Sequence, residues 1–166
     1  DRSEPMLNQA RTIIPRLTDR VTFVHSDINE FMGQSQPEEY DIWASGFMLH
    51  NFLKPLRRQT IQEIYRVTRP GGVFGMIDKI AVDDETQHQA HYAAQMEQIE
   101  RFVGIGKPEL RDWWVRHYED DEAKKATEGE IASILEEAGF VDVQFSNRVM
   151  IDVVVTAVKQ EKKETE

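Results

Sequence analysis

Acidic and polar residues at predicted strand ends are the first candidates for chemistry in this sequence. They are Asp27, Ser45–Gly46, Asp78 and, if it closes a strand that precedes it, Asp1. A carboxylate at the carboxyl end of a parallel strand can accept hydrogen bonds from two ribose hydroxyls or from one exocyclic amine. A nucleoside cofactor requires these hydrogen bonds, so the pattern favours such a ligand. Any single aspartate of this kind could instead be a turn residue or a helix cap.

The apolar pattern predicts the elements that would position these residues. Helical spacing predicts three core helices, at residues 3–17, 55–68 and 128–138. Short β-rich runs predict strands at residues 21–24, 40–44, 73–77, 141–145 and 151–158, with a turn at 69–72. Ser3 is the expected N-cap of the first helix, and Thr127 with Glu130 forms an expected capping box closed by Gly139.

The order of these elements predicts the fold class. Residues 146–148 are too few for a crossover helix, so the last two strands must be antiparallel. The remaining order predicts an α/β fold with a mostly parallel sheet and a C-terminal antiparallel hairpin. An α-helical insert is expected over residues 83–126, with an interruption at 104–108, and residues 159–166 are expected to form a charged, frayed tail.

Composition excludes several classes of protein. The chain has 166 residues, of which 40% are hydrophobic and 30% charged, as in one globular domain. Its net charge of -10 repels polyphosphate, and no apolar run approaches the roughly 20 residues that span a bilayer. Zero cysteines exclude disulfides and thiolate metal sites and fit a reducing compartment. We therefore expect a cytoplasmic protein with no nucleic-acid or membrane partner, and we leave a homodimer open.

Five segments in series carry a family resemblance. They are Asp1-Arg-Ser-Glu-Pro-Met-Leu7, Val21-Thr-Phe-Val-His-Ser-Asp27, Asp41-Ile-Trp-Ala-Ser-Gly-Phe-Met-Leu-His50, Glu63-Ile-Tyr-Arg-Val-Thr-Arg-Pro-Gly-Gly-Val73 and Leu135-Glu-Glu-Ala-Gly-Phe140 with the hairpin after it. Their order and spacing resemble class I S-adenosylmethionine-dependent methyltransferases. The resemblance implies a Rossmann-like sheet, S-adenosylmethionine as cofactor and methyl transfer to a small-molecule acceptor.

The resemblance also implies which residues hold the cofactor. Asp1 is similar to the acid that binds the ribose hydroxyls, and Asp27 to the acid that accepts the adenine amino group. The backbone of Ile28 would meet the ring edge, and Met6 would flank adenine unless it is ordinary helix core. The residues beside the methionine part of the cofactor would be Ser45 and Gly46.

Catalytic and substrate residues follow from the same resemblance. His50 is in a position similar to one that faces the substrate, where an imidazole could act as a base, although it could equally be a structural residue at a helix start. The helical insert often forms a substrate-selecting lid in this family, so we expect the following residues to contact the acceptor: Phe47, Tyr92, Trp113, His117 and Tyr118. The aromatic stripe could instead only dock the insert on the sheet. His88 and His91 have no matched third ligand, so we predict no metal site.

The family's glycine-rich first motif has no counterpart in the sequence, since Gly104-Ile-Gly106 follows a helical stripe and not a strand. We therefore expect residues 1–166 to be an incomplete methyltransferase domain without its N-terminal strands, and to be inactive alone. In the alternative, the fragment folds alone by pairing strands 21–24 and 40–44. A noncatalytic binding or scaffold module on the same fold also stays open. An NAD(P)-dependent oxidoreductase is less favoured, because it would not predict the terminal hairpin and no Tyr-x-x-x-Lys occurs.

Overall fold

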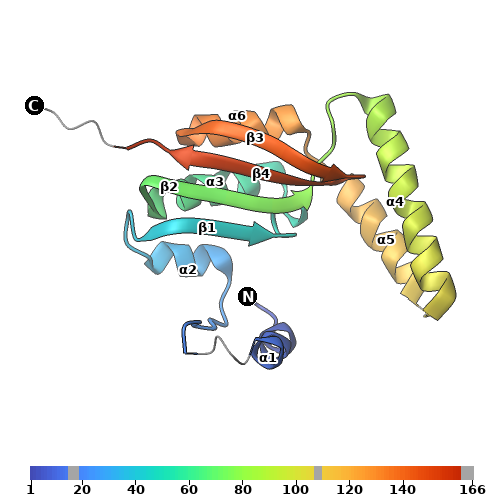
Figure 1. Ribbon diagram of the computed structural model, residues 1–166, viewed down its shortest axis with the longest axis horizontal. Coiled ribbons are helices and arrows are strands. Elements are labelled where there is room, and N and C mark those ends of the chain that lie inside the picture. Colours follow the sequence, from blue (N-terminus) through green and yellow to red (C-terminus); the bar gives the residue numbers. More distant parts are fainter. Residues whose placement is uncertain (15–18, 107–109, 162–166) are drawn as a thin grey trace, which may run out of the picture. The chain divides into compact units, whose positions relative to one another are not determined.

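A four-stranded sheet organises most of the chain (Figure 1). The computed structural model describes residues 1–14, 19–106 and 110–161, with the backbone alone for 102–106. The chain divides into two units, Asp1–Gln36 and Pro37–Glu166. The sheet belongs to the second unit and has the order β1-β2-β4-β3. Its strands are β1 (Tyr40–Gly46), β2 (Thr68–Lys79), β3 (Phe140–Val149) and β4 (Asp152–Lys159).

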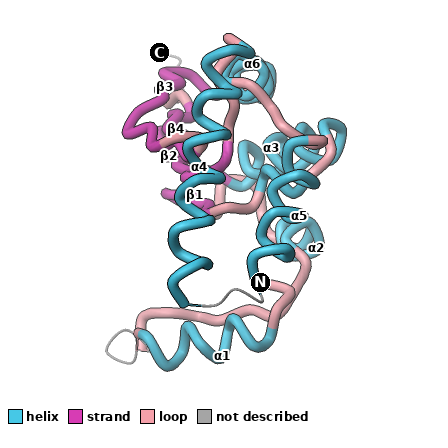
Figure 2. The backbone as a smooth tube through the Cα atoms, turned by 90° about the vertical axis from the view of Figure 1, so that its right-hand side faces the viewer, coloured by secondary structure: helices cyan, strands magenta, loops and turns pink. Residues whose placement is uncertain are grey.

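Strand directions agree with the expected topology. β1 and β2 are parallel, whereas β4 is antiparallel to both β2 and β3. Two helices, α3 (Lys54–Val67) and α6 (Glu128–Ala138), pack against one face of the sheet (Figure 2). The predicted capping box of Thr127 and Glu130 is present, and Gly139 ends α6 with a φ of 108°. The α/β fold with its C-terminal hairpin is therefore confirmed.

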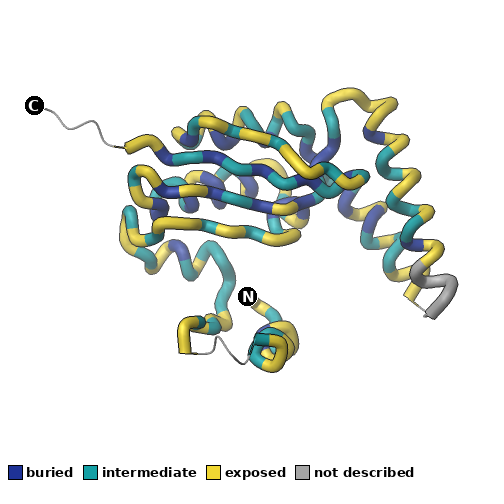
Figure 3. Tube along the Cα trace, in the orientation of Figure 1, coloured by how far each residue is buried: buried dark blue, intermediate teal, exposed yellow. Residues whose placement is uncertain are grey.

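Side chains alternate between a buried and an exposed face along β2. Phe74 and Met76 are buried toward α3 and α6, whereas Val73 and Ile77 on the other face are 37% and 40% exposed. Ile42, which lies on the edge strand β1 and is paired in register with Val73, is 70% exposed. Much of β1 is exposed in the same way (Figure 3). The apolar core of this unit therefore lies on the helix-covered side of the sheet.

The first unit contains α1 (Glu4–Ile13) and α2 (Ile28–Gln34). Ser3 caps α1 as expected, because its Oγ accepts a hydrogen bond from the Met6 N–H at 3.4 Å. Residues 15–18 of the predicted helix lie outside the described residues. α2 was not predicted, and its N-cap is Asp27, whose Oδ1 accepts from the Asn29 N–H at 2.9 Å.

The predicted strand at residues 21–24 is wrong. Among the described residues this segment has no strand ladder: the backbone nitrogen of Asp1 donates to the Val24 carbonyl at 3.0 Å, and the Ser26 N–H donates to the Asp1 carbonyl at 3.2 Å. A strand needs several successive backbone partners, and two hydrogen bonds to a single residue do not provide them. The alternative pairing of this segment with the 40–44 strand is therefore not found.

Two further boundaries differ from the predictions, and a third agrees in part. The expected turn at 69–72 is the start of β2, where Gly71 with a φ of 77° accommodates the irregular pairing opposite β1. Lys159 is not frayed: it is 8% exposed and its Nζ donates to the carbonyls of Tyr65 and Thr68, both at 2.8 Å. The interruption expected at 104–108 agrees with the helix ends in part: α4 continues to Gly106 and α5 begins at Arg111, while residues 107–109 lie outside the described residues.

The insert forms two helices, α4 (Glu85–Gly106) and α5 (Arg111–Glu122), beside the end of the sheet at which β1 ends (Figure 1). A cluster of Ile99 from α4, Tyr118 from α5 and Ile151 from the β3–β4 turn is buried, with Tyr92, Met96 and Trp114 packed against it. Part of the aromatic stripe therefore docks the insert, as the alternative interpretation expected. None of the described helices is long and apolar enough to cross a membrane.

Candidate active site

A buried carboxylate–imidazole pair lies where β1 and β2 end. The two strands are parallel and Gly46 is paired with Ile77, so the residues that follow them are neighbours. His50 lies in a short 3-10 helix after β1, η2 (Leu49–Asn51), and Asp78 lies at the end of β2. His50 Nδ1 is 2.5 Å from Asp78 Oδ1, and the two residues are 7% and 1% exposed.

The Asp78 carboxylate holds both the backbone and the imidazole of His50. Oδ2 accepts hydrogen bonds from the Leu49 N–H at 2.7 Å and the His50 N–H at 3.3 Å, and Oδ1 accepts from the Lys79 N–H at 2.9 Å. An ionised carboxylate can only accept, so His50 Nδ1 carries a hydrogen, and in the neutral form of this imidazole Nε2 has the lone pair. The imidazole is therefore oriented as a proton acceptor at Nε2.

Arg57 fixes the other side of η2. This α3 residue is 3% exposed, and its guanidinium donates to the carbonyls of Leu49 at 3.1 Å, Phe52 at 2.8 Å and Lys124 at 2.7 Å. Burial lowers the pKa of Arg57 from its usual value, an effect that the nearby Asp78 opposes. The short helix that carries His50 is thus held by hydrogen bonds from two elements.

Helix α5 adds a second buried carboxylate to the site. Asp121 is 7% exposed, and its Oδ2 lies 3.8 Å from His50 Nε2, 3.4 Å from His117 Nε2 and 2.5 Å from Lys79 Nζ. Burial and the charge of Lys79 lower the pKa of His117. The sequence suggested that residues 119–122 are a solvated acidic face, and this was wrong for Asp121. The usable signal was its i+4 spacing from His117, which puts both side chains on one helix face.

His50, His117 and Asp121 could together hold a metal ion, because one ligand atom from each lies within 4.8 Å of the others. Lys79 Nζ, however, lies 2.5 Å from the Asp121 carboxylate and 3.3 Å from His117 Nε2. An ammonium group already provides the positive charge between these donors, so we assign no metal here. His88, for its part, uses Nε2 for the Glu122 carboxylate, 3.0 Å away.

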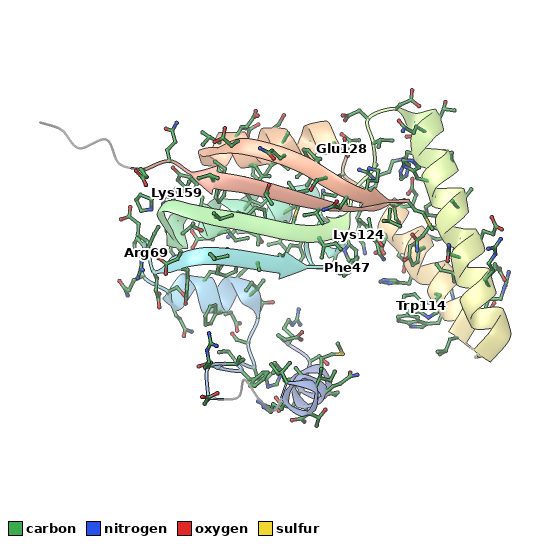
Figure 4. All side chains as sticks on the ribbon, viewed as in Figure 1. Phe47, Arg69, Trp114, Lys124, Glu128 and Lys159 are labelled. Carbon is green, nitrogen blue, oxygen red and sulfur yellow. The ribbon has the colours of Figure 1, made fainter. Side chains whose placement is uncertain are left out.

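The end of β1 carries two features typical of a binding site. Ser45 Oγ is buried without a hydrogen-bond partner. Phe47 has a φ of 50°, a left-handed conformation that is uncommon outside glycine, and it is 46% exposed beyond the end of β1 (Figure 4). A Cβ added at Gly46 would meet nothing closer than Ile77 Cγ2 at 4.0 Å. Space and an unsatisfied hydroxyl are therefore available here.

The predicted adenosine residues lie in the first unit. Asp1 and Ile28 line a hollow of about 250 Å³, and Asp27 lines another of about 320 Å³, with Ser26 shared by both. Besides capping α2, Asp27 lies 3.6 Å from the Arg2 guanidinium. Met6 is 56% exposed and lines neither hollow. The structure thus brings three of the four residues together.

The predicted substrate residues separate into two groups. Tyr92 and Tyr118 line a cavity of about 20 Å³ that also contains His50 and Asp121. Trp113 is 54% exposed and stacks on His117 with ring centroids 5.3 Å apart. Lys79 was not predicted as part of this site, and Asp78 was predicted only as a polar residue at a strand end.

Comparisons with known proteins agree with this fold. Residues 1–72 match the protein family described as a methyltransferase domain. No curated protein sequence matches the chain. Among solved structures, a possible exported protein from Bordetella parapertussis has a TM-score of 0.69 at 18% identity, over 96% of this chain and 52% of that chain.

Two further structures are methyltransferases by name. An O-methyltransferase family protein from Burkholderia thailandensis has a TM-score of 0.64 at 16% identity, over 94% of this chain and 41% of its own. A SAM-dependent methyltransferase from Aquifex aeolicus has a TM-score of 0.56 at 20% identity, over 96% of this chain and 66% of its own. The chain thus spans about half or less of the first two structures.

The fold and the strand-end site define a Rossmann-like α/β protein with a polar site at the carboxyl ends of its parallel strands. More particularly, the chain has the fold of the class I S-adenosylmethionine-dependent methyltransferases, and the resemblance predicted from sequence is confirmed.

Proposed function

We propose that the protein to which this chain belongs transfers a methyl group from S-adenosylmethionine to a small-molecule acceptor, with His50 as general base. The family match and the fold support the reaction class. The observation that carries the role of His50 is its buried pairing with Asp78, which leaves Nε2 as an acceptor at the end of β1.

The residues present fit the proposed cofactor. Carboxylates at Asp1 and Asp27 can accept the ribose and adenine hydrogen bonds, and the unpartnered Ser45 hydroxyl can bind the methionine part. Ile28 would meet the adenine ring. Met6 and Gly46 are also proposed to contact the cofactor. When bound, S-adenosylmethionine supplies an electrophilic methyl group on a positively charged sulfur.

Each site residue has a distinct task in the proposed reaction. His50 Nε2 accepts the proton that a hydroxyl or amine of the acceptor loses. Asp78 acts through His50: its hydrogen bond fixes the tautomer and the ring orientation, so it is a positioning residue. Arg57 supports the same loop through the Leu49 carbonyl.

We further propose a cytoplasmic protein with no nucleic-acid or membrane partner and with no metal. The support is the absence of cysteine and the net charge of -10. We also propose that residues 83–126 act as the lid of the acceptor site and that the 166-residue chain alone is inactive. Phe47, Tyr92, His117 and Tyr118 are the proposed acceptor contacts, and Trp113 is a more peripheral one.

Calorimetric titration of the full-length protein with S-adenosylhomocysteine tests cofactor binding. We expect Asp27→Ala to weaken binding at least about tenfold, which is the loss of one charged hydrogen bond. The matched control is Asp19→Ala, an exposed acid of the same unit that lines neither hollow. No heat at millimolar ligand, or equal affinity in both variants, would reject the assignment and favour a noncatalytic module.

The role of His50 has a separate test. His50→Gln is expected to lower kcat about 10²–10⁴-fold with little change in cofactor affinity, and to remove the rise of kcat with pH that a base produces. His91→Gln on α4 is the matched control. A His50→Gln enzyme with unchanged kcat would show that no base is needed there.

A further inference from the structure

A cavity of about 410 Å³ lies in the helical insert, outside the carboxylate–imidazole pair. Its walls come from α4, from α5 and from the β3–β4 hairpin at its turn. The lining residues used below are Gln95, Gln98, Trp114, Tyr118 and Asp152. Tyr118 also lines the small cavity that contains His50, so the two cavities are neighbours. This volume can hold a small organic molecule.

Aromatic rings form the wall contributed by α5. The rings of Trp114 and Tyr118 lie 6.3 Å apart, and both pack against the buried Ile99 and Ile151 cluster (Figure 4 labels Trp114). The Tyr118 hydroxyl already accepts a hydrogen bond from Gln95 Nε2 at 3.3 Å. The wall therefore offers flat apolar surface, which favours a planar ligand.

The described residues that line the cavity carry negative charge only. Among these described residues, Asp152 is the only carboxylate and none is Lys or Arg, and Asp152 Oδ1 is buried without a hydrogen-bond partner. Burial raises the pKa of Asp152, assisted by the charge of Asp78 and opposed by Lys79. Lys79 is opposite Asp152 in the β2–β4 register, but its ammonium group is engaged by Asp121 at 2.5 Å. Burial also raises the pKa of Tyr118 to about 12.

We propose that this cavity binds the methyl acceptor, and that the acceptor is a small planar apolar molecule with an amine that Asp152 recognises and with no anionic group. An amine supplies the hydrogen-bond donor that the free carboxylate oxygen lacks, and a cation offsets its charge. An anionic molecule would enter a site that has a buried carboxylate and no cation among its described lining residues, so it is rejected. The role as acceptor rests on the proposed methyl transfer, whereas the binding itself does not.

The test compares two probes with the same hydroxyphenylethyl group on the 166-residue chain without cofactor. They are 2-(4-hydroxyphenyl)ethylamine and 3-(4-hydroxyphenyl)propionate, which differ in the charged end only. We expect the amine to bind at least about tenfold more tightly by calorimetry, equal to ~1.4 kcal/mol. Asp152→Asn should reduce this ratio to near one, and Trp114→Leu should weaken both probes. Asp120→Asn, an exposed acid of α5 outside the cavity, is the matched control.

The proposal is overturned if the carboxylate probe binds as tightly as the amine, or if Asp152→Asn keeps the preference. The wild-type comparison decides this even if a variant does not fold. Failure of the proposed methyl transfer is recognised separately. In that case the wild-type protein does not bind S-adenosylhomocysteine in the Asp27 experiment, whereas the preference of the cavity for the amine probe is retained.

Discussion

Replacing Asp78 tests whether the end of β2 is the anchor of the site. Asp78→Ala removes the carboxylate that accepts four hydrogen bonds. Three come from the backbone N–H groups of Leu49, His50 and Lys79, and the fourth comes from His50 Nδ1. These donors lie in a buried region, so water does not replace the carboxylate without rearrangement of η2. The perturbation therefore leaves several polar groups unsatisfied at once.

The magnitude follows from this count. Each net hydrogen bond contributes about 1 kcal/mol, and removing one member of a buried pair costs about 3–5 kcal/mol. We expect Asp78→Ala to lower the free energy of unfolding by about 3–5 kcal/mol. Asp78→Asn keeps one acceptor oxygen but turns an NH₂ group toward N–H donors, so we expect a loss of about 2–4 kcal/mol.

Urea denaturation of the 166-residue chain, followed by circular dichroism, measures these losses. The matched control is Asp41→Asn on the neighbouring strand: its carboxylate is 76% exposed and pairs with Arg69, so we expect a change below about 0.5 kcal/mol. In a double-mutant cycle, Asp78→Asn and His50→Ala should couple by about 1 kcal/mol or more. Equal effects of the two Asp→Asn changes, or additivity in the cycle, would refute the reasoning.

Three further predictions concern the packing around the site. Gly139→Ala should destabilise the fold by about 2–4 kcal/mol, because φ is 108° and the new Cβ would lie 2.7 Å from Tyr65 Cζ. The control is Gly75→Ala on β2, whose Cβ would meet nothing within 4 Å and should change the free energy of unfolding little in the same urea assay. Thr127→Ala removes the capping box of α6 and should cost about 1 kcal/mol by thermal or urea unfolding. The raised pKa of Tyr118, about 12, means that the folded state keeps its proton where the unfolded state loses it, so stability is present below pH 10 and is lost between about pH 10 and 12. Tyr118→Phe should remove that slope, and absorbance titration at about 295 nm should show one late-ionising tyrosine; a slope that survives in the variant would contradict the assignment.

Local signals explain which elements could be predicted from the sequence. The capping box at Thr127 and the left-handed cap at Gly139 are decided within a few residues, and both ends of α6 were predicted correctly. The hairpin was also local, since so short a connection cannot hold a crossover, although β3 continues through the expected connection at 146–148 to Val149. The segment at 21–24 failed for the opposite reason: β-propensity cannot tell whether a distant partner strand is present.

The site was predicted in part for the same physical reason. Strand-end positions pointed to Ser45 and Asp78, because parallel strands bring their carboxyl ends together, whereas His50 came from the family resemblance. Asp121 and Lys79 come together only when α5 docks on the sheet end, a contact 42 residues apart in sequence. No spacing rule reports such a contact, and an acidic run is more commonly exposed.

Buried polar atoms without hydrogen-bond partners lower the stability of the fold at the places where they lie. In the described residues the side-chain atoms of this kind include Ser45 Oγ, Asp121 Oδ1 and Asp152 Oδ1. By contrast, Thr68 in the helix-covered core is fully buried but its hydroxyl donates to the Ile64 carbonyl at 2.6 Å. An unsatisfied buried polar group costs about 1–3 kcal/mol, so a protein selected for stability alone would not collect several of them near one end of its sheet. The groups that a ligand would satisfy therefore gather at the strand ends and the insert, where the proposed reaction needs them.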